Sequence, residues 1–496
     1  MEKSSPDNLK NRLLSSCRRY LDERSVKEIA KAVDLAAKYH DGTLRKSGDP
    51  FVIHPLNSAI KLTALHADKN TIVAAVLHDS IEDTNLPSHL IKKEFGAEVL
   101  NLVESVTKLS RIRIKKGWFP FGKVEKEEIP EFERQAETLR KMLVAMARDI
   151  RVILIKLADK IHNLETLDSL DEKKRERIAG EAIEIYAPIA QRLGMGEWKG
   201  ELEDLAFPYV LPQEYKKLTA LAVPRIQERE RYLERIAKKN IQPLLESNYI
   251  EGEINYRAKR WYSLYQKLQK YDSDLSKIYY LIAVRNIVTT IEDCYSVLGA
   301  IHGQWRPLVG RIKDFIALPK PNGYRSIHTT VFCEEGQIVE FQIRTWEMHR
   351  QAEFGVAAHW IYGRTKSSKA PTKKEVSWLK DFSKTQKKIT NPQDLASSFS
   401  MDLFQDRIFV FTPGGDVKDL PAGATPVDFA YSIHTDLGNK CAGAIVNGKI
   451  EQLNSRLENG DIVEIIKRKN AKPHADWLKF VKTHLARTNI RREIKS

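Results

Sequence analysis

The heptapeptide HDSIEDT at 78–84 constrains this chain more than any other segment, because it directly follows the apolar run 71–77. The run predicts a buried helix, and on one continuous helix residues four positions apart share a face. The stacked pairs would be His78 with Glu82 and Asp79 with Asp83. Carboxylates crowded in this way repel one another unless a cation lies between them or a proton neutralises one. A divalent metal would remove the repulsion, and the alternative is a solvated helix face with a chance histidine.

A second acidic position lies on the apolar helix predicted near residues 152–166. Asp159, Asn163 and Thr166 fall at i, i+4 and i+7, which places them on one stripe of that helix. A buried carboxylate needs a partner, because burying it alone is costly. A metal shared with His54, His78 and Asp79 would supply that partner. The alternative, an N-capping or surface aspartate, fits poorly with a position in mid-helix.

A loop rich in glycine and proline, residues 40–50, precedes His54. It carries two adjacent cations, Arg45 and Lys46. It begins with His40 and Asp41, but no carboxylates follow this pair, so we interpret His40 as structural. A basic and aromatic insertion at 110–132 predicts an exposed loop.

The composition favours a globular protein that binds anions. The length of 496 residues predicts several domains, and a net charge of +15 favours nucleotides, nucleic acid or a ribosome-like surface as partners. No Lys-rich segment has a strong apolar face, which argues against a membrane surface. The start of the chain has no signal-peptide core, and no apolar run approaches membrane-spanning length.

The cysteines are scattered and form no CxxC pair. This pattern argues against a disulfide framework or a cysteine-based zinc site and favours a reducing cytoplasm. The positions are Cys17, Cys294, Cys333 and Cys441.

The sequence changes character several times along the chain. A helical pattern covers 1–196, a mixed α/β pattern follows at 197–363, and a linker rich in Lys, Ser and Thr covers 364–401. A compact β-rich unit at 402–468 precedes a basic helical tail at 469–496, which ends without a cap and suggests a longer natural protein. The strands predicted in the mixed segment are 278–287, 309–318, 329–332 and 338–343.

The mixed segment gathers cations around a glycine turn with an aromatic residue. Cations suit phosphates and a tyrosine can stack on a base, so the segment suits a nucleoside triphosphate. No Walker loop is present, so a P-loop fold is not indicated. The positions are Arg257, Lys259, Lys267, Arg311, Lys313, Lys320, Tyr324 and His328.

Six motifs occur in a fixed order: RKSGDPFVIHP, HDSIEDT, KLADKIHNL, GRIKDFIALPKPNGYRSIHTT, VEFQIRT and AEFGVAAHW. Together they resemble the RelA/SpoT homologue family, the long (p)ppGpp synthetase/hydrolases of bacteria, over about residues 20–480. The resemblance implies a multidomain α+β protein with three domains. They are an all-helical HD-type hydrolase domain at 1–196, a mixed α/β nucleotidyltransferase-like synthetase domain at 197–363 and a small β-grasp TGS domain at 402–468. The further helical, zinc-binding and ACT-type regions of many family members are missing.

For the hydrolase domain, the resemblance implies breakdown of (p)ppGpp to GDP or GTP and pyrophosphate in the stringent response. The implied metal ligands are His54, His78, Asp79 and Asp159, a set of nitrogen and oxygen donors that fits Mn²⁺. Glu82 would handle protons and Asp83 would orient the water. Arg45 and Lys46 would hold the guanine and phosphates, and Asn163 and Thr166 the ribose side. Glu165 stands where the family commonly has an arginine.

For the synthetase domain, the resemblance implies transfer of pyrophosphate from ATP to the 3′-OH of GDP or GTP with Mg²⁺. The ATP-side positions are Arg257, Lys259, Ser263 and Lys267. The acceptor-side positions are Arg311, Lys313, Lys320, Asn322, Tyr324 and His328, and Glu340 matches the acid near the acceptor hydroxyl.

Two departures put synthesis in doubt. Tyr280 stands at the position of the magnesium-binding aspartate, and a neutral phenol is a poor Mg²⁺ ligand. The GRPKH pattern of the family is altered to YRAKR at 256–260. We therefore expect chiefly a hydrolase with a weak or inactive synthetase.

Two alternatives remain open at this point. In a bifunctional enzyme, Asp293 or Asp314 would replace the missing magnesium ligand. In a regulatory protein, the TGS domain would dock on uncharged tRNA or the ribosome, and His434 matches the family residue near the tRNA 3′ end.

Overall fold

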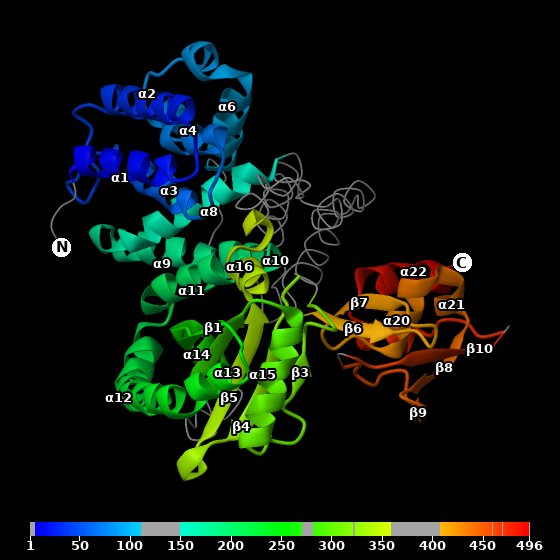
Figure 1. Ribbon diagram of the computed structural model, residues 1–496. Coiled ribbons are helices and arrows are strands. Elements are labelled where there is room, and N and C mark those ends of the chain that lie inside the picture. The colour runs from blue at the N-terminus through cyan, green and yellow to red at the C-terminus, as the bar shows by residue number, and fades with distance from the viewer. Residues whose placement is uncertain are drawn as a thin grey trace. The chain divides into compact units, whose positions relative to one another are not determined.

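The computed structural model describes residues 5–110, 149–269, 281–320, 323–358, 407–458, 460–468 and 470–495. Most of the insertion at 110–132, the linker at 364–401, Tyr280 and Asn322 lie outside these residues. The chain divides into two compact units, and each is described by itself (Figure 1). Of the described residues, those up to 358 belong to the first unit and those from 407 onward to the second.

The N-terminal part of the first unit is all-helical. Its helices are α1 (Pro6–Arg18), α2 (Glu23–Tyr39), α3 (Ile53–Thr63), α4 (Lys69–Leu77), α5 (Ser80–Asp83), α6 (Ser88–Ser110), α8 (Ile150–Glu165), α9 (Glu172–Glu181) and α10 (Ala187–Arg192). Most of them begin at a residue whose side chain accepts a backbone N–H of the first turn, the usual N-cap arrangement. These N-caps are Ser5, Asp22, Asp68, Asp149 and Asp171.

The metal-directed segment is not one continuous helix, so the stacking predicted for His78 with Glu82 is wrong. The second predicted pair keeps a helical contact, because the Asp83 N–H bonds to the Asp79 carbonyl oxygen at 2.9 Å. Helix α4 ends at Leu77, and the separate short helix α5 begins at Ser80. The carbonyl of His78 accepts the Thr107 hydroxyl at 3.2 Å, and the Glu82 N–H bonds to Asp79 instead. The break leaves His78 buried, while Glu82 and Asp83 are exposed.

Helix α11 (Gly196–Val210) links the helical part to the sheet that follows. It packs against α8 and α9 on the helical side and against α14 (Trp261–Gln269) and α16 (Trp346–Phe354) on the other (Figure 1). The chain then continues through α12 (Pro212–Ile236), a π-helical turn (Ala237–Ile241) and α13 (Gln242–Ser247).

A five-stranded mixed sheet forms the centre of the second half of this unit. Its order is β1-β2-β5-β4-β3, and only the pair β2/β5 is parallel. Strand β2 is buried along its whole length, and α15 (Ile291–Gln304) packs on the sheet. The strands are β1 (Gly252–Ala258), β2 (Ile282–Val288), β3 (Lys313–Asp314), β4 (Ile327–Phe332) and β5 (Ile338–Thr345).

Two strand predictions need correction. The strand predicted over 309–318 is reduced to the two residues of β3. Gly310 has φ +72 in a turn before it, and the Asp314 carboxylate accepts the N–H groups of Ile316 and Ala317 after it. Strand β1, which carries Arg257, was not predicted, because its charged and polar sequence GEINYRA lacks a clear apolar alternation.

The second unit is small and combines strands with short helices. The hairpin β6–β7 and the sheet β10-β8-β9 are joined by a parallel bridge between Phe411 and Ile462. The buried Asp428 of α20 accepts backbone N–H groups of Lys482 and Thr483, which ties the start of α22 to the unit. The elements are β6 (Arg407–Phe411), β7 (Val417–Pro421), α20 (Pro426–Ile433), α21 (Thr435–Asn439), β8 (Cys441–Val446), β9 (Lys449–Glu451), β10 (Val463–Lys467) and α22 (His484–Lys495).

The predicted fold class is confirmed: a helical domain, a mixed-sheet domain and a small domain built on strands. Within the part of the chain that is described, no helix has the length and apolarity required to cross a bilayer.

Candidate active sites

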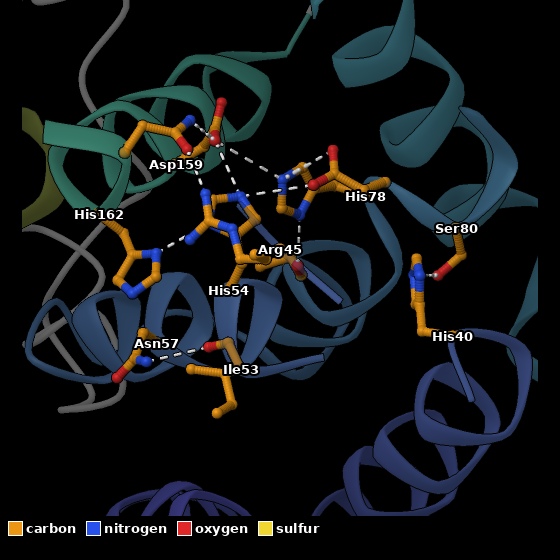
Figure 2. Close-up of polar contacts among 12 residues, drawn as sticks. His40, Arg45, Ile53, His54, Asn57, His78, Ser80, Asp159 and His162 are labelled. Carbon is orange, nitrogen blue, oxygen red and sulfur yellow. Dashed lines mark hydrogen bonds and ion pairs between the residues drawn. The ribbon is translucent and has the colours of Figure 1, made fainter. Parts of the chain in front are cut away.

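Three buried side chains from separate helices meet in the helical domain. They come from α3, from the end of α4 and from α8, and each offers a ligand atom within 4.8 Å of the others (Figure 2). The three are His54, His78 and Asp159. Asp79 joins them, with its carboxylate oxygens 3.1 Å from His78 Nε2 and 3.4 Å from His54 Nε2. Three of the four residues predicted as metal ligands therefore converge, and the fourth, Asp79, contacts both imidazoles.

The chemistry of this cluster fits a divalent cation. His78 Nε2 is buried and makes no hydrogen bond among the described residues, while its Nδ1 lies 2.7 Å from the Ala75 carbonyl oxygen. His54 also directs Nε2 inward, 3.1 Å from Asp159 Oδ1. Two imidazole nitrogens and two carboxylates that face one another form a donor set for Mn²⁺, Fe²⁺ or Zn²⁺.

The titration of the cluster reflects the charge collected there. Burial alone would lower the pKa of His78, but Asp79 and Asp159 outweigh it and raise the value to about 9. Burial would raise the pKa of Asp159, but Lys156 and the two imidazoles hold it well below its ordinary range. The cluster therefore attracts positive charge, whether a proton or a cation.

A second layer of contacts fixes Asp159. Lys156 Nζ donates to Asp159 Oδ2 at 2.6 Å, and Asn163 Nδ2 donates to Oδ1 at 2.6 Å. Lys156 was not predicted from the sequence, although a lysine inside the apolar run VILIKLA is a sign of a buried, paired charge. His162 was not predicted either, and its Nδ1 lies 2.8 Å from His54 Nδ1.

Three of the four residues predicted to hold the nucleotide in this half lie together. Arg45 donates to Asn163 Oδ1 at 2.9 Å and to Thr166 Oγ1 at 3.4 Å. The Arg45 guanidinium thus lies directly beside α8, the helix that carries Asp159. The fourth, Lys46, is exposed, and the neighbouring Lys174 lowers its pKa.

The predicted catalytic pair lies on α5, directly after the predicted ligand Asp79. Partial desolvation raises the pKa of Asp83 to about 6, and Asp79 and Glu82 add repulsion in the same direction. A carboxyl with such a pKa can exchange protons near neutral pH. Glu165, the departure from the family pattern, pairs with Lys61 at 2.8 Å and touches none of the four ligands.

A cavity of about 430 Å³ lies between α11 and the sheet. Residues from the helical side, among them Gly194, Lys199 and Glu203, form one wall. Gly355 allows the close approach on that side, because a Cβ there would lie 2.0 Å from the Leu193 carbonyl oxygen. The residues predicted for synthesis that line the cavity are Arg257, Lys259, Ser263, Tyr324 and Glu340.

The strand register explains how the sheet builds this wall. Arg257 pairs with Ala283, and Ala283 pairs with Glu340, so the three side chains form a row on one face. The small alanine between the charged residues leaves space for the cavity. The other predicted positions, Lys267, Arg311, Lys313, Lys320 and His328, do not line it, although His328 Nδ1 lies 3.4 Å from Glu340.

The cavity holds partly buried side chains of opposite charge. Burial lowers the pKa of Lys259 to about 7, against the attraction of Glu340. Burial would raise the pKa of Glu340, but His328 and Lys259 bring it to about 2. The cavity therefore combines an ionised acid with a lysine that is half-protonated near neutral pH.

Carboxylates of the protein already engage Arg257. Its guanidinium lies 3.0 Å from Glu353 and 3.2 Å from Glu197, the first-turn glutamate of α11. Arg260 also pairs with Glu197. Neither glutamate was predicted from the sequence, because Glu197 and Glu353 lie 60 and 96 residues from Arg257 along the chain.

The two aspartates considered as replacement magnesium ligands have structural contacts. Asp293 forms the capping box of α15 with Thr290. Asp314 accepts the Tyr295 hydroxyl at 2.8 Å as well as two backbone N–H groups. In the second unit, His434 Nδ1 accepts the Asp436 N–H at 3.2 Å and so caps α21.

Comparisons with known families divide the chain in the same order. Residues 32–196 match the family described as "HD domain", residues 256–367 match "Region found in RelA / SpoT proteins", and residues 408–467 match "TGS domain".

Two similar curated proteins carry different names. A guanosine-3′,5′-bis(diphosphate) 3′-pyrophosphohydrolase of Aquifex aeolicus is 45% identical over 471 residues, which cover 95% of this chain and 65% of that protein. A GTP pyrophosphokinase of Myxococcus xanthus is 45% identical over 492 residues, which cover 99% of this chain and 63% of that protein. The chain thus spans somewhat less than two thirds of the length of these relatives.

Solved structures with local similarity include a metazoan orthologue of SpoT and the small alarmone synthetase 2 from Bacillus subtilis. The first is 25% identical, with 36% of this chain and 85% of that chain covered and a TM-score of 0.22. The second is 26% identical, with 33% and 91% covered and a TM-score of 0.24.

Proposed function

This chain belongs to the RelA/SpoT family, with HD, RelA/SpoT and TGS domains, and we propose that its helical domain is a Mn²⁺-dependent (p)ppGpp 3′-pyrophosphohydrolase of the cytoplasm. The observation that carries the proposal is the convergence of His54, His78 and Asp159, with the Asp79 carboxylate beside both imidazoles. The name of the Aquifex relative supports the same substrate.

These residues have distinct parts in the proposed reaction. Water attacks the phosphorus attached to O3′, the bond between them breaks, and GDP or GTP and pyrophosphate are released. Mn²⁺ held by the four ligands would lower the pKa of water and polarise the phosphate. Glu82 accepts the proton of the water, which Asp83 orients, and Arg45 binds phosphate beside Asn163 and Thr166.

Metal removal provides the first test. We expect the chain treated with chelator to lose breakdown of ppGpp to the background rate, because the attacking water would no longer be activated by a cation. Added Mn²⁺ should restore the rate, measured as release of pyrophosphate. A parallel sample dialysed without chelator controls for loss of folded protein. An undiminished rate in chelator would contradict the metal assignment.

For the mixed-sheet domain we propose nucleotide binding with weak or absent pyrophosphate transfer. The cavity beside Lys259 and Glu340 supports the binding, and Tyr280 in place of a magnesium ligand argues against transfer. The structural contacts of Asp293 and Asp314 leave neither as a ready substitute. A bifunctional enzyme remains the main alternative, because relatives are named for both activities.

Docking of the TGS domain on tRNA or a ribosome through the region of His434 is a further proposal of partners.

The pKa of Lys259 predicts how ATP binding depends on pH. Burial lowers this pKa to about 7, so above pH 7 Lys259 of the free protein is mostly neutral. A bound triphosphate, which is negatively charged, favours the protonated lysine. Binding must then take up a proton, and affinity should fall by up to about tenfold per pH unit between pH 7 and 9. Calorimetric titration with ATP at three pH values measures the slope.

The matched control is Lys259→Arg. Arginine stays charged over this range, so the variant should show a much flatter dependence on pH. Equal slopes in the two proteins would show that another group is responsible.

A further inference from the structure

We propose that His162 is a positioning residue of the metal site: it accepts the Nδ1–H of His54 and so fixes the tautomer that presents Nε2 to the cation. The inference rests on the proposed metal-dependent hydrolase and concerns a residue with no assigned role. It follows from one contact, His54 Nδ1 to His162 Nδ1 at 2.8 Å (Figure 2).

Two ring nitrogens approach this closely only when one carries a hydrogen and the other is bare. A metal ligand must offer a bare nitrogen, and His54 Nε2 is the atom that faces the carboxylates, 3.1 Å from Asp159 and 3.4 Å from Asp79. With a cation on Nε2, the hydrogen of a neutral His54 ring must reside on Nδ1, and His162 Nδ1 is the acceptor within reach.

The other proposed imidazole ligand, His78, also has a hydrogen-bond acceptor beside its Nδ1, but that acceptor is a backbone carbonyl. His78 Nδ1 lies 2.7 Å from the carbonyl oxygen of Ala75, which can only accept a hydrogen bond. The tautomer of His78 is thus set by the backbone of α4. The tautomer of His54 depends on a side chain, which can be replaced.

His162 is itself held rigidly. It is buried, with 5% of its surface exposed, and lies on α8 three residues after Asp159. One helical turn therefore supplies both a ligand and the group that orients another ligand. The contact uses Nδ1 of both rings, which is the side of His54 turned away from the carboxylates, so His162 is not a fifth ligand.

Metal affinity tests this role without reliance on catalysis. The experiment titrates Mn²⁺ into the full chain, follows the free ion by electron paramagnetic resonance, and compares wild type with His162→Leu and His162→Asn. Leucine fills similar space without an acceptor, whereas the asparagine Oδ1 can occupy the place of Nδ1. We expect His162→Leu to weaken Mn²⁺ binding by about 10- to 100-fold and His162→Asn to retain most of the affinity.

Controls separate this role from packing and from the proposed function. His302→Leu removes a histidine that contacts Thr329 in the mixed sheet and should leave Mn²⁺ affinity unchanged, and thermal unfolding shows whether each variant is folded. Wild-type affinity in His162→Leu, or equal loss in both His162 variants when folded, would overturn the inference alone. Failure of the wild-type chain to bind Mn²⁺ would overturn the proposed metal-dependent function itself.

Discussion

Asp79→Asn should lower kcat/KM for ppGpp hydrolysis by about 10³-fold, which corresponds to about 4 kcal/mol of transition-state stabilisation. Asp79 is the carboxylate that approaches both imidazole ligands, and its side chain retains 17% exposure at the open side of the cluster. The amide keeps the shape of the residue but loses the charge that balances the cation. Release of pyrophosphate from ppGpp measures the activity, and titration with Mn²⁺ measures the accompanying loss of affinity.

The matched control is the same substitution at Asp41. That aspartate also follows a histidine, but it is exposed in the loop at 40–50 and is not among the converging ligands. Asp41→Asn should hydrolyse ppGpp at the wild-type rate. If Asp79→Asn kept more than a tenth of that rate, Asp79 would not be a ligand of the catalytic metal.

The position of the proposed metal site could be inferred from the sequence because its candidate ligands lie in short motifs with strong local context. His78 and Asp79 follow an apolar helix, and Asp159 lies on a second one, so burial and charge together indicate a cation. The backbone conformation around His78 could not be predicted in the same way. The helix is interrupted between Leu77 and Ser80, where the His78 carbonyl accepts the Thr107 hydroxyl from 29 residues away in sequence.

The contacts behind the ligands were also beyond sequence analysis. His162 reaches His54 across 108 residues, and the pairing requires α3 and α8 to pack side by side. The spacing of residues within α8 predicts which side chains share a face, but not which element lies opposite. Groups that support a metal site through tertiary contacts therefore become visible only in the folded chain.

The nucleotide cavity illustrates the same limit for the mixed sheet. Its cations could be listed from the sequence, but β1 was missed, and with it the row formed by Arg257, Ala283 and Glu340. The wall supplied by α11 depends on helix packing between two halves of the unit. Because both halves build this cavity, tests of synthesis require the full chain.

Tyr280→Asp should raise synthesis of ppGpp from ATP and GDP by about 10²- to 10³-fold in the presence of Mg²⁺, if this position alone limits the reaction. A carboxylate there would restore an anionic oxygen for Mg²⁺ on the ATP phosphates, an effect worth several kcal/mol in phosphoryl transfer. The next residue, Leu281, accepts the backbone N–H of the cavity-lining Lys259 at 2.9 Å. Chromatography of labelled nucleotides measures the product.

The substitution is best made together with Asp79→Asn, because breakdown would otherwise consume the product. Tyr279→Asp in the same background is the matched control, since it adds the same charge one position away and should give no gain. Synthesis already robust without Tyr280→Asp would contradict an impaired synthetase and favour a bifunctional enzyme. Absence of any gain would place the defect in the altered YRAKR segment at 256–260 as well, where Arg257 is already paired with Glu197 and Glu353.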